Sequence, residues 1–151
     1  MTVIIDGRKT REARLQELIK RIKSLSFIPK LAIVQVGDRA DSTSYIRAKK
    51  LLAKKIGVDV DHRQFPEDIA QTQLSQYILQ LNDNKDIQGI IIQLPLPKQI
   101  DRRMTIDLII PQKDVDALTS TSVANWSKGE GIVPATARGV HELLDQYSIS
   151  L

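Results

Sequence analysis

Three short segments of the chain carry side chains whose types and spacing suit chemistry on a small ligand. In the first, Tyr45 and Lys49 are four residues apart in a predicted helix, so the phenol and the amine project from one face. Nearby basic side chains and the positive end of the helix dipole favour the neutral amine, which lets Lys49 exchange protons near neutral pH. A half-buried tyrosine beside a solvated lysine has the same spacing, so the spacing alone leaves the role of this pair open.

The second segment runs from Gln93 to Pro97 and follows a buried apolar stretch. Pro95 and Pro97 hold the chain extended and prevent the strand from continuing, so Gln93 should end its strand at an edge of the sheet. An amide both donates and accepts hydrogen bonds, and it therefore suits a substrate carbonyl or a lysine amine. The alternative is a rigid exit loop with a hydrogen-bonded glutamine.

The third segment contains Asp114, Val115 and Asp116. In an extended chain the two carboxylates lie on one side and Val115 on the other. A carboxylate here can accept two parallel N–H bonds from an aminopyrimidine edge, and the alternative is a solvated acidic loop or an Asx turn.

No metal centre is expected from this composition. The chain has no cysteine, and its two histidines, His62 and His141, are far apart in the sequence. Two carboxylates without a third oxygen-rich position also make a poor magnesium or calcium site. The chemistry therefore has to come from oxygen, amine and amide side chains.

The elements that must position these residues alternate between helices and strands. We expect helices over 10–25, 43–56 (capped by Ser42, ended by Gly57), through Leu74, Ile78 and Leu81, over 102–110 and from about 136 to 148, strands over 31–36, 58–65 and 89–93, and a long loop over 112–134. Short connections between such elements predict an α/β three-layer sandwich, a mainly parallel sheet with helices on both faces. Ligands of such folds bind beyond the carboxyl ends of the strands.

The apolar positions of these helices define the faces expected to be buried. They are Leu15, Leu18, Ile19, Ile22 and Leu25 in the first helix, Ile46, Leu51, Leu52 and Ile56 in the second, and Val140, Leu143, Leu144 and Tyr147 in the last.

Length and composition narrow the class of protein. The 151 residues suit one domain over 1–151, and 42% hydrophobic with 26% charged residues are globular values. The sequence shows no membrane-spanning run and no signal peptide, so we expect a cytoplasmic protein without a membrane partner. The net charge of +4 raises the alternative of a basic adaptor for nucleic acid, but 4% aromatic residues offer no stacking platform, and no nucleic-acid partner is expected.

Taken in this order, the three segments resemble the methylenetetrahydrofolate dehydrogenase/cyclohydrolase family of one-carbon metabolism. The family's Gln-Leu-Pro-Leu-Pro is present letter for letter from Gln93 to Pro97, and its Lys-Asp-Val-Asp from Lys113 to Asp116. Its other motifs match at Val36, Gly37, Ser42, Tyr45, Ile46 and Lys49, at Pro134, Thr136 and Gly139, and at Ile4, Ile5, Asp6 and Gly7.

The resemblance implies a folate substrate and assigns roles to the singled-out residues. Lys49 would be the central acid/base, Tyr45 would line or stack on the pterin, Gln93 would orient the lysine, and Asp116 would hold the aminopyrimidinone edge. Leu94, Pro95 and Val115 would also contact the substrate, and Thr136 the cofactor. Such enzymes oxidise methylenetetrahydrofolate with NADP and then hydrolyse the methenyl product to formyltetrahydrofolate.

Only the family's substrate-binding half is matched. The last helix, about 136–148, is expected to begin the linker to an NADP-binding Rossmann domain, so this chain should not hold NADP tightly, and the parent protein is expected to be a homodimer. Ala117 replaces the family's glycine, which matters if that position requires positive φ. The alternative function is a degenerate, non-catalytic pterin-binding or regulatory domain.

Overall fold

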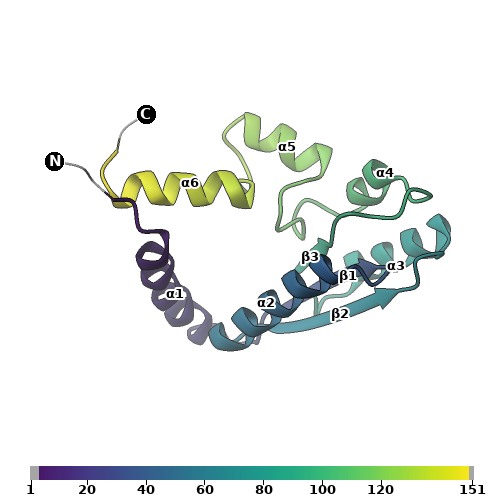
Figure 1. Ribbon diagram of the computed structural model, residues 1–151, viewed down its shortest axis with the longest axis horizontal. Coiled ribbons are helices and arrows are strands. Elements are labelled where there is room, and N and C mark those ends of the chain that lie inside the picture. The colour runs from purple at the N-terminus through teal and green to yellow at the C-terminus, as the bar shows by residue number, and fades with distance from the viewer. Residues whose placement is uncertain (1–3, 150–151) are drawn as a thin grey trace.

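The three strands form one parallel sheet in the order β2–β1–β3 (Figure 1). The structure is a computed structural model that describes residues 4–149. The strands are β1 (Lys30–Val36), β2 (Asp59–Phe65) and β3 (Gly89–Ile92). Ile33 of β1 is in register with His62 on one side and with Ile91 on the other. The predicted parallel sheet is therefore confirmed, with β2 at one edge as its alternating pattern indicated.

Helices cover both faces of this sheet, as the three-layer prediction requires. On one face α3 (Gln71–Asp83) and α4 (Arg102–Asp107) contribute to the main core, and on the other Ile46 of α2 (Ala40–Ile56) packs against Ile33 and Ile91. Leu74 and Ile78 of α3 are fully buried, and each such side chain contributes about 1.5–3 kcal/mol. The main core consists of Ala32, Val34, Val36, Ile69, Leu74, Ile78, Leu81, Ile87, Ile90, Ile92, Ile100, Ile106 and Ile109.

The start of α2 differs from its prediction. The helix begins at Ala40, with Arg39 at the N-cap, so the prediction that Ser42 caps a helix starting at Thr43 is wrong. Ser42 lies in the first turn and is buried. The end is confirmed, because Gly57 adopts the left-handed conformation that stops the helix, with φ 84°.

Several leucines of the first two helices are exposed, contrary to expectation. The helix α1 spans Gly7–Lys23 and begins at the capping side chain of Asp6, earlier than predicted. Figure 1 shows it beside the end of α2 and away from the sheet. Of its predicted stripe, Leu15 is buried and Ile19 and Ile22 are half-buried. The exposed leucines are Leu18, Leu25, Leu51 and Leu52.

The stretch expected to be a long loop contains a helix, α5 (Ser120–Ser127). Thr119 caps it, accepting a hydrogen bond from the Ser122 backbone at 3.0 Å. Its two large apolar side chains, Val123 and Trp126, are both more than two-fifths exposed, so the sequence carries little periodic signal there. The loop before it makes an isolated parallel bridge between Asp114 and Ile90 of β3.

The last helix, α6 (Ala135–Gln146), lies apart from the sheet and next to the start of α1 (Figure 1). Among its described residues none is fully buried, and Val140 is 52% exposed, so the prediction that Val140 points inward is wrong. Leu143, Leu144 and Tyr147 are half-buried, and the Tyr147 hydroxyl accepts a hydrogen bond from the Asp6 backbone at 2.8 Å. The helix is thus tied to α1 rather than to the core.

No helix within residues 4–149 combines the length and the apolar character needed to cross a lipid bilayer.

Candidate functional site

The predicted site residues come from three elements that meet on the α2 side of the sheet. Lys49 lies on α2, Gln93 directly follows β3, and Asp116 lies in the loop after α4. The structure brings the Lys49 amine and the Gln93 amide together, with Nζ donating to Oε1 at 3.2 Å. The sequence-based prediction that the two side chains can meet is thereby realised in the geometry.

Gln93 is held in a fixed orientation. Its backbone N–H donates to the Val34 carbonyl at 2.8 Å, and its side-chain Nε2 donates to the Leu94 carbonyl at 2.9 Å. Since the amide nitrogen is occupied, the amide oxygen faces Lys49 as an acceptor. A half-buried lysine amine is thus oriented by a neutral partner.

Asp116 lies close enough to this pair for its charge to interact with Lys49. Burial raises the pKa of the Asp116 carboxyl above its usual value, the nearby Lys49 ammonium opposes that rise, and Asp114 adds to it. The side chain is half-buried. Lys49, Gln93 and Asp116 therefore form one cluster with an amine, an amide and a carboxylate.

The neighbouring residues of the Asp116 loop are structural. The Lys113 amine donates to the carbonyls of Leu81, Asn82 and Asn84 at 2.9, 2.6 and 2.7 Å, and so caps the end of α3. These contacts attach the start of the loop to a helix of the opposite layer.

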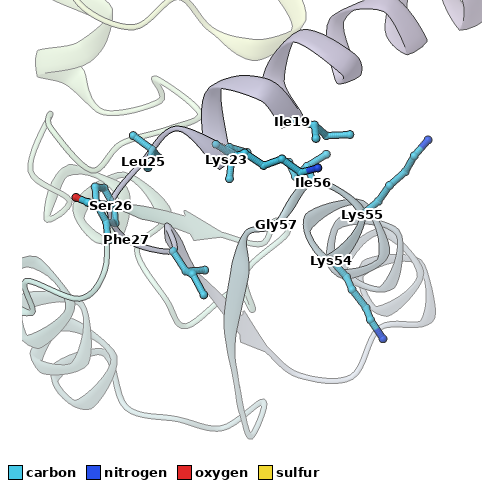
Figure 2. Close-up of a pocket in the computed structure, with 11 residues that line it drawn as sticks. Ile19, Lys23, Leu25, Ser26, Phe27, Lys54, Lys55, Ile56 and Gly57 are labelled. Carbon is cyan, nitrogen blue, oxygen red and sulfur yellow. The ribbon is translucent and has the colours of Figure 1, made fainter.

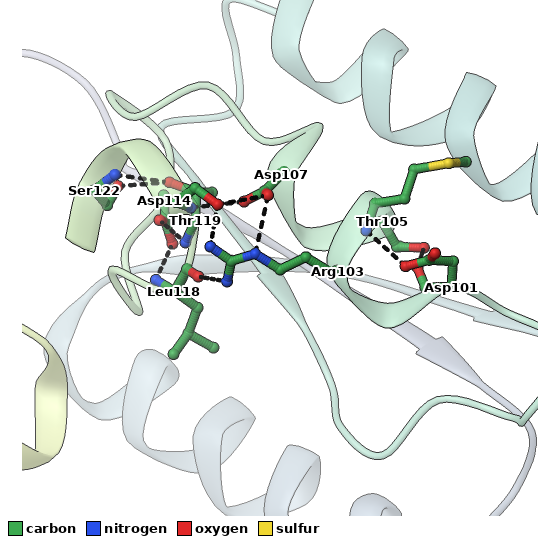
Figure 3. A network of polar contacts seen from close by, with 10 residues as sticks. Asp101, Arg103, Thr105, Asp107, Asp114, Leu118, Thr119 and Ser122 are labelled. Atoms are coloured by element: carbon green, nitrogen blue, oxygen red, sulfur yellow. Dashed lines mark hydrogen bonds and ion pairs between the residues drawn. The ribbon is translucent and has the colours of Figure 1, made fainter. Parts of the chain in front are cut away.

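The Asp114 carboxylate is likewise used for hydrogen bonds within the protein. It is 1% exposed and accepts the backbone N–H groups of Leu118 and Thr119 at 3.2 and 2.9 Å, as Figure 3 shows. Arg103 adds a second tie, because it donates to the Leu118 carbonyl at 3.2 Å. Of the two predicted carboxylates, only Asp116 is left for a ligand.

Ala117 follows Asp116 in a conformation that favours glycine. Its φ is 52° and its methyl group is fully buried. The position therefore does require positive φ, as the comparison with the family glycine anticipated.

The other predicted contact residues lie around this cluster in different environments. Tyr45 is 67% exposed, and Val115 packs against the Ile33, Ile46 and Ile91 cluster. Leu94 packs against the main core, and Pro95 is exposed. Pro95 also lines a hollow of about 510 Å³ between the loop after β1 and the segment 95–99. This hollow lies at the carboxyl edge of the sheet, although neither Lys49 nor Gln93 lines it.

Thr136 lies in the first turn of α6, away from this cluster. It lines a hollow of about 480 Å³ between α6 and α1, together with Gly7, Val140 and Leu143. It is exposed there.

Another groove, of about 480 Å³, lies at the opposite edge of the sheet. Residues at the ends of α1 and α2 and in the segment before β1 line it, among them Ile19, Phe27 and Ile56. Figure 2 shows the Lys54 and Lys55 side chains extending away from these residues. Because α2 ends here, this groove lies at the amino ends of the strands, away from Lys49. It is not a part of the candidate site.

Sequence reasoning missed a buried polar group behind α2. Gln35 is 1% exposed and contacts both Thr43 and His62. The available signal was a single amide inside the apolar run from Leu31 to Val36.

The comparisons with known proteins agree on one family. The model of the tetrahydrofolate dehydrogenase/cyclohydrolase catalytic domain matches residues 5–116. The bifunctional protein FolD of a Thermus thermophilus strain is 35% identical over 149 residues, covering 98% of this chain and 53% of that protein. The cytoplasmic C-1-tetrahydrofolate synthase of Schizosaccharomyces pombe is 36% identical, covering all of this chain and 17% of that protein.

Solved structures give the same result. A 5,10-methylenetetrahydrofolate dehydrogenase from the silkworm Bombyx mori superposes with a TM-score of 0.94 at 34% identity, over 99% of this chain and 53% of that one. The Trypanosoma brucei FolD, solved with NADP and an inhibitor, gives 0.88 at 31% identity, over 97% and 52%. The chain thus spans about half the length of the FolD relatives it matches.

Proposed function

Because this chain belongs to the tetrahydrofolate dehydrogenase/cyclohydrolase family, we propose that it is a folate-binding catalytic domain in which Lys49 carries out the hydrolysis of methenyltetrahydrofolate. The observation that supports this most directly is the 3.2 Å hydrogen bond between Lys49 Nζ and Gln93 Oε1. It joins the amine and the amide that the family motifs singled out, on the side of the sheet where Asp116 also lies.

The proposed reaction needs one group that both accepts and donates a proton. Water attacks the methenyl carbon, and the neutral Lys49 amine takes one proton from it, which leaves a tetrahedral carbinolamine. The carbon–nitrogen bond to the pterin ring then breaks, and the Lys49 ammonium protonates the departing nitrogen. The carbinolamine hydroxyl releases its proton to solvent water as the formyl group forms, which gives the one net proton that hydrolysis of a methenyl cation produces. Gln93 keeps the amine in place during both transfers.

Asp116 and Tyr45 are proposed to hold the substrate. The Asp116 carboxylate would accept two N–H bonds from the aminopyrimidinone edge, and these would replace the water that its partial burial removes. The exposed Tyr45 ring offers a face on which a flat pterin can stack. Leu94, Pro95 and Val115 are proposed as further contacts.

The turn after β1 lacks the features of a pyrophosphate-binding turn. The turn after β1 contains one glycine, Gly37, and an ion pair between Arg39 and Asp41 at 2.8 Å, where a pyrophosphate needs several free backbone N–H groups. We propose that hydride transfer requires a nucleotide-binding half to which α6 leads, and that the full-length protein is a cytoplasmic homodimer. Thr136, on α6, is proposed as a cofactor contact there.

Lys49→Met tests the proposed role of the amine. The variant should bind a tetrahydrofolate analogue but lose at least about 100-fold of the rate of methenyltetrahydrofolate hydrolysis, since general acid–base catalysis contributes about 10²–10⁴. Loss of substrate absorbance measures the rate and calorimetry the binding, with Lys20→Met, an exposed lysine of α1, as the control. Equal rates in the variant and the parent would contradict the proposal.

A second candidate is a pterin-binding domain without turnover. The observation that favours it is Ala117, because an alanine occupies, directly after Asp116, a position with φ 52° that glycine adopts without strain. It predicts that the parent chain binds the folate analogue while hydrolysing methenyltetrahydrofolate no faster than buffer does.

A further inference from the structure

We propose that Gln35 and His62 are positioning residues, which fix the rotation of α2 about its axis and so place the Lys49 amine at Gln93. The expected effect on catalysis depends on the proposed function, whereas the placement of Lys49 does not. The polar side chains that support it, those of Gln35, Thr43, Lys50 and His62, are not among the residues that match the family motifs.

Gln35 lies at the centre of a group of hydrogen-bonded side chains, and both its amide nitrogen and its amide oxygen have partners. Its Nε2 donates to the Gly37 carbonyl at 3.1 Å and to the Thr43 hydroxyl at 3.3 Å, and its Oε1 contacts His62 Nε2 at 3.0 Å. The side chain is 1% exposed, so each of these contacts replaces water that the folded protein excludes.

The direction of every hydrogen bond in this group can be assigned. An ammonium only donates, so His62 Nδ1 accepts from Lys50 Nζ at 2.9 Å. The His62 proton therefore resides on Nε2 and is donated to the Gln35 oxygen. That assignment agrees with Gln35 Nε2 acting as the donor to both of its partners.

These hydrogen bonds attach α2 to the sheet at two points, Thr43 and Lys50, between which most of the turn that carries Lys49 lies. Thr43 and Lys50 are seven residues apart, which is two turns of helix, and each is bonded to a strand residue. Ile46, which lies between them, is 2% exposed against Ile33 and Ile91. Lys49 is next to Lys50 in the chain, so a rotation of α2 that broke either attachment would also move the Lys49 amine.

The register of the sheet brings this group next to the site. Val34 of β1 pairs with Ile92, the last residue of β3, and Gln35 and Gln93 each come directly after this pair. One glutamine bonds α2 through Thr43, and the other bonds α2 through Lys49. The two amides thus bond to the same helix, one from β1 and the other from the residue that follows β3.

The test measures the Lys49 amine without relying on turnover. Trace acetylation with acetic anhydride, read by peptide mass spectrometry against exposed Lys20, reports how accessible and how free each amine is. In Gln35→Leu the relative reactivity of Lys49 should rise about three- to tenfold, the range that corresponds to one net hydrogen bond. Thr43→Val should show the same rise in Lys49 reactivity, and it provides the test if Gln35→Leu does not fold.

Gln64→Leu is the matched control. Gln64 also donates to the Gly37 carbonyl, at 2.9 Å, but it lies on exposed β2 positions. Its replacement should leave Lys49 reactivity as in the parent. His62→Gln retains one donor and one acceptor and should also preserve it, whereas His62→Leu should reproduce the rise.

These outcomes separate the inference from the proposed function. Unchanged Lys49 reactivity in Gln35→Leu, Thr43→Val and His62→Leu would overturn the inference, as would an equal rise in Gln64→Leu. If the parent hydrolyses methenyltetrahydrofolate, Gln35→Leu should lower kcat with little change in KM, and a change confined to KM would count against it. A parent without turnover would overturn the proposed function and leave the labelling result standing.

Discussion

Asp116 is the residue at which folding and binding make opposite demands. Its burial raises the pKa of the carboxyl in the folded protein, so the charged form is destabilised there relative to the unfolded chain. A ligand that donates N–H bonds would remove this cost. We therefore expect the residue to lower the stability of the free domain in exchange for a binding contact.

Asp116→Asn should make the free domain more stable at neutral pH. A raised pKa means that the folded state binds more protons than the unfolded state, so stability falls as the pH rises through that interval. The variant lacks this loss, and its advantage should vanish as the pH falls below the ordinary aspartate value of 3.8. Urea unfolding across pH measures it, with exposed Asp68→Asn as the control, and a less stable variant at neutral pH would refute the argument.

Ala117 should tolerate glycine and reject a branched side chain. Ala117→Val places a β-branched residue at φ 52° in a fully buried position and should cost more than about 2 kcal/mol of unfolding free energy. Ala117→Gly should stay within about 1 kcal/mol of the parent, because relief of the backbone offsets the lost methyl burial and the greater chain entropy. Urea unfolding measures both, and Ala124→Val on exposed α5 should be nearly neutral. A well-tolerated valine would show that the loop relaxes at this position.

At the scale of elements, the loop that carries Asp116 depends on the end of α3. Lys113 reaches three carbonyl oxygens of α3 and the residue after it, which the helix leaves unpaired. The contact joins the two layers that the sheet separates.

Lys113→Met should lower the unfolding free energy by about 1.5–3 kcal/mol, the range for hydrogen bonds to a charged group. The methionine keeps much of the aliphatic stem and removes the donors. Lys85→Met, a nearby exposed lysine, should change stability little. Chemical unfolding measures the difference, and similar values for the two variants would contradict the capping role.

The elements that could be predicted from the sequence are those whose apolar pattern results directly from burial in the core. The buried strands β1 and β3 and the α3 face of Leu74, Ile78 and Leu81 were correct, because burial on a sheet requires those apolar positions. The start of α2 was wrong, because Ser42 suits a cap by type but is needed inside the helix. The helix α5 was missed, since it is held by polar contacts of Thr119 and has little apolar period.

The residues of the candidate site could be predicted from the sequence, but the residues that hold them in position could not. The motifs pointed to Lys49, Gln93 and Asp116, and two of these make direct contact. The opposite uses of Asp114 and Asp116 could not be read from their spacing, because the loop is not a regular strand and only Asp114 turns into the protein. Gln35 and His62 act together only after two strands pair, which local sequence does not reveal.

At the scale of the whole molecule, the described chain leaves many apolar side chains uncovered. Tyr45 and Leu52 on α2 and Val140 on α6 are each at least 40% exposed. Figure 1 shows α6 held beside α1 and separate from the sheet.

The bridge between Asp114 and Ile90 has a consequence for solubility. At one side of the sheet, β2 presents alternating charges that discourage another strand from pairing with it. At the other side, the Ile90 N–H donates to the Lys113 carbonyl at 2.8 Å, so the loop that carries Asp116 also protects the apolar strand β3 from edge-to-edge association. Changes that loosen this loop, and with it the proposed substrate contact, are therefore expected to promote aggregation as well.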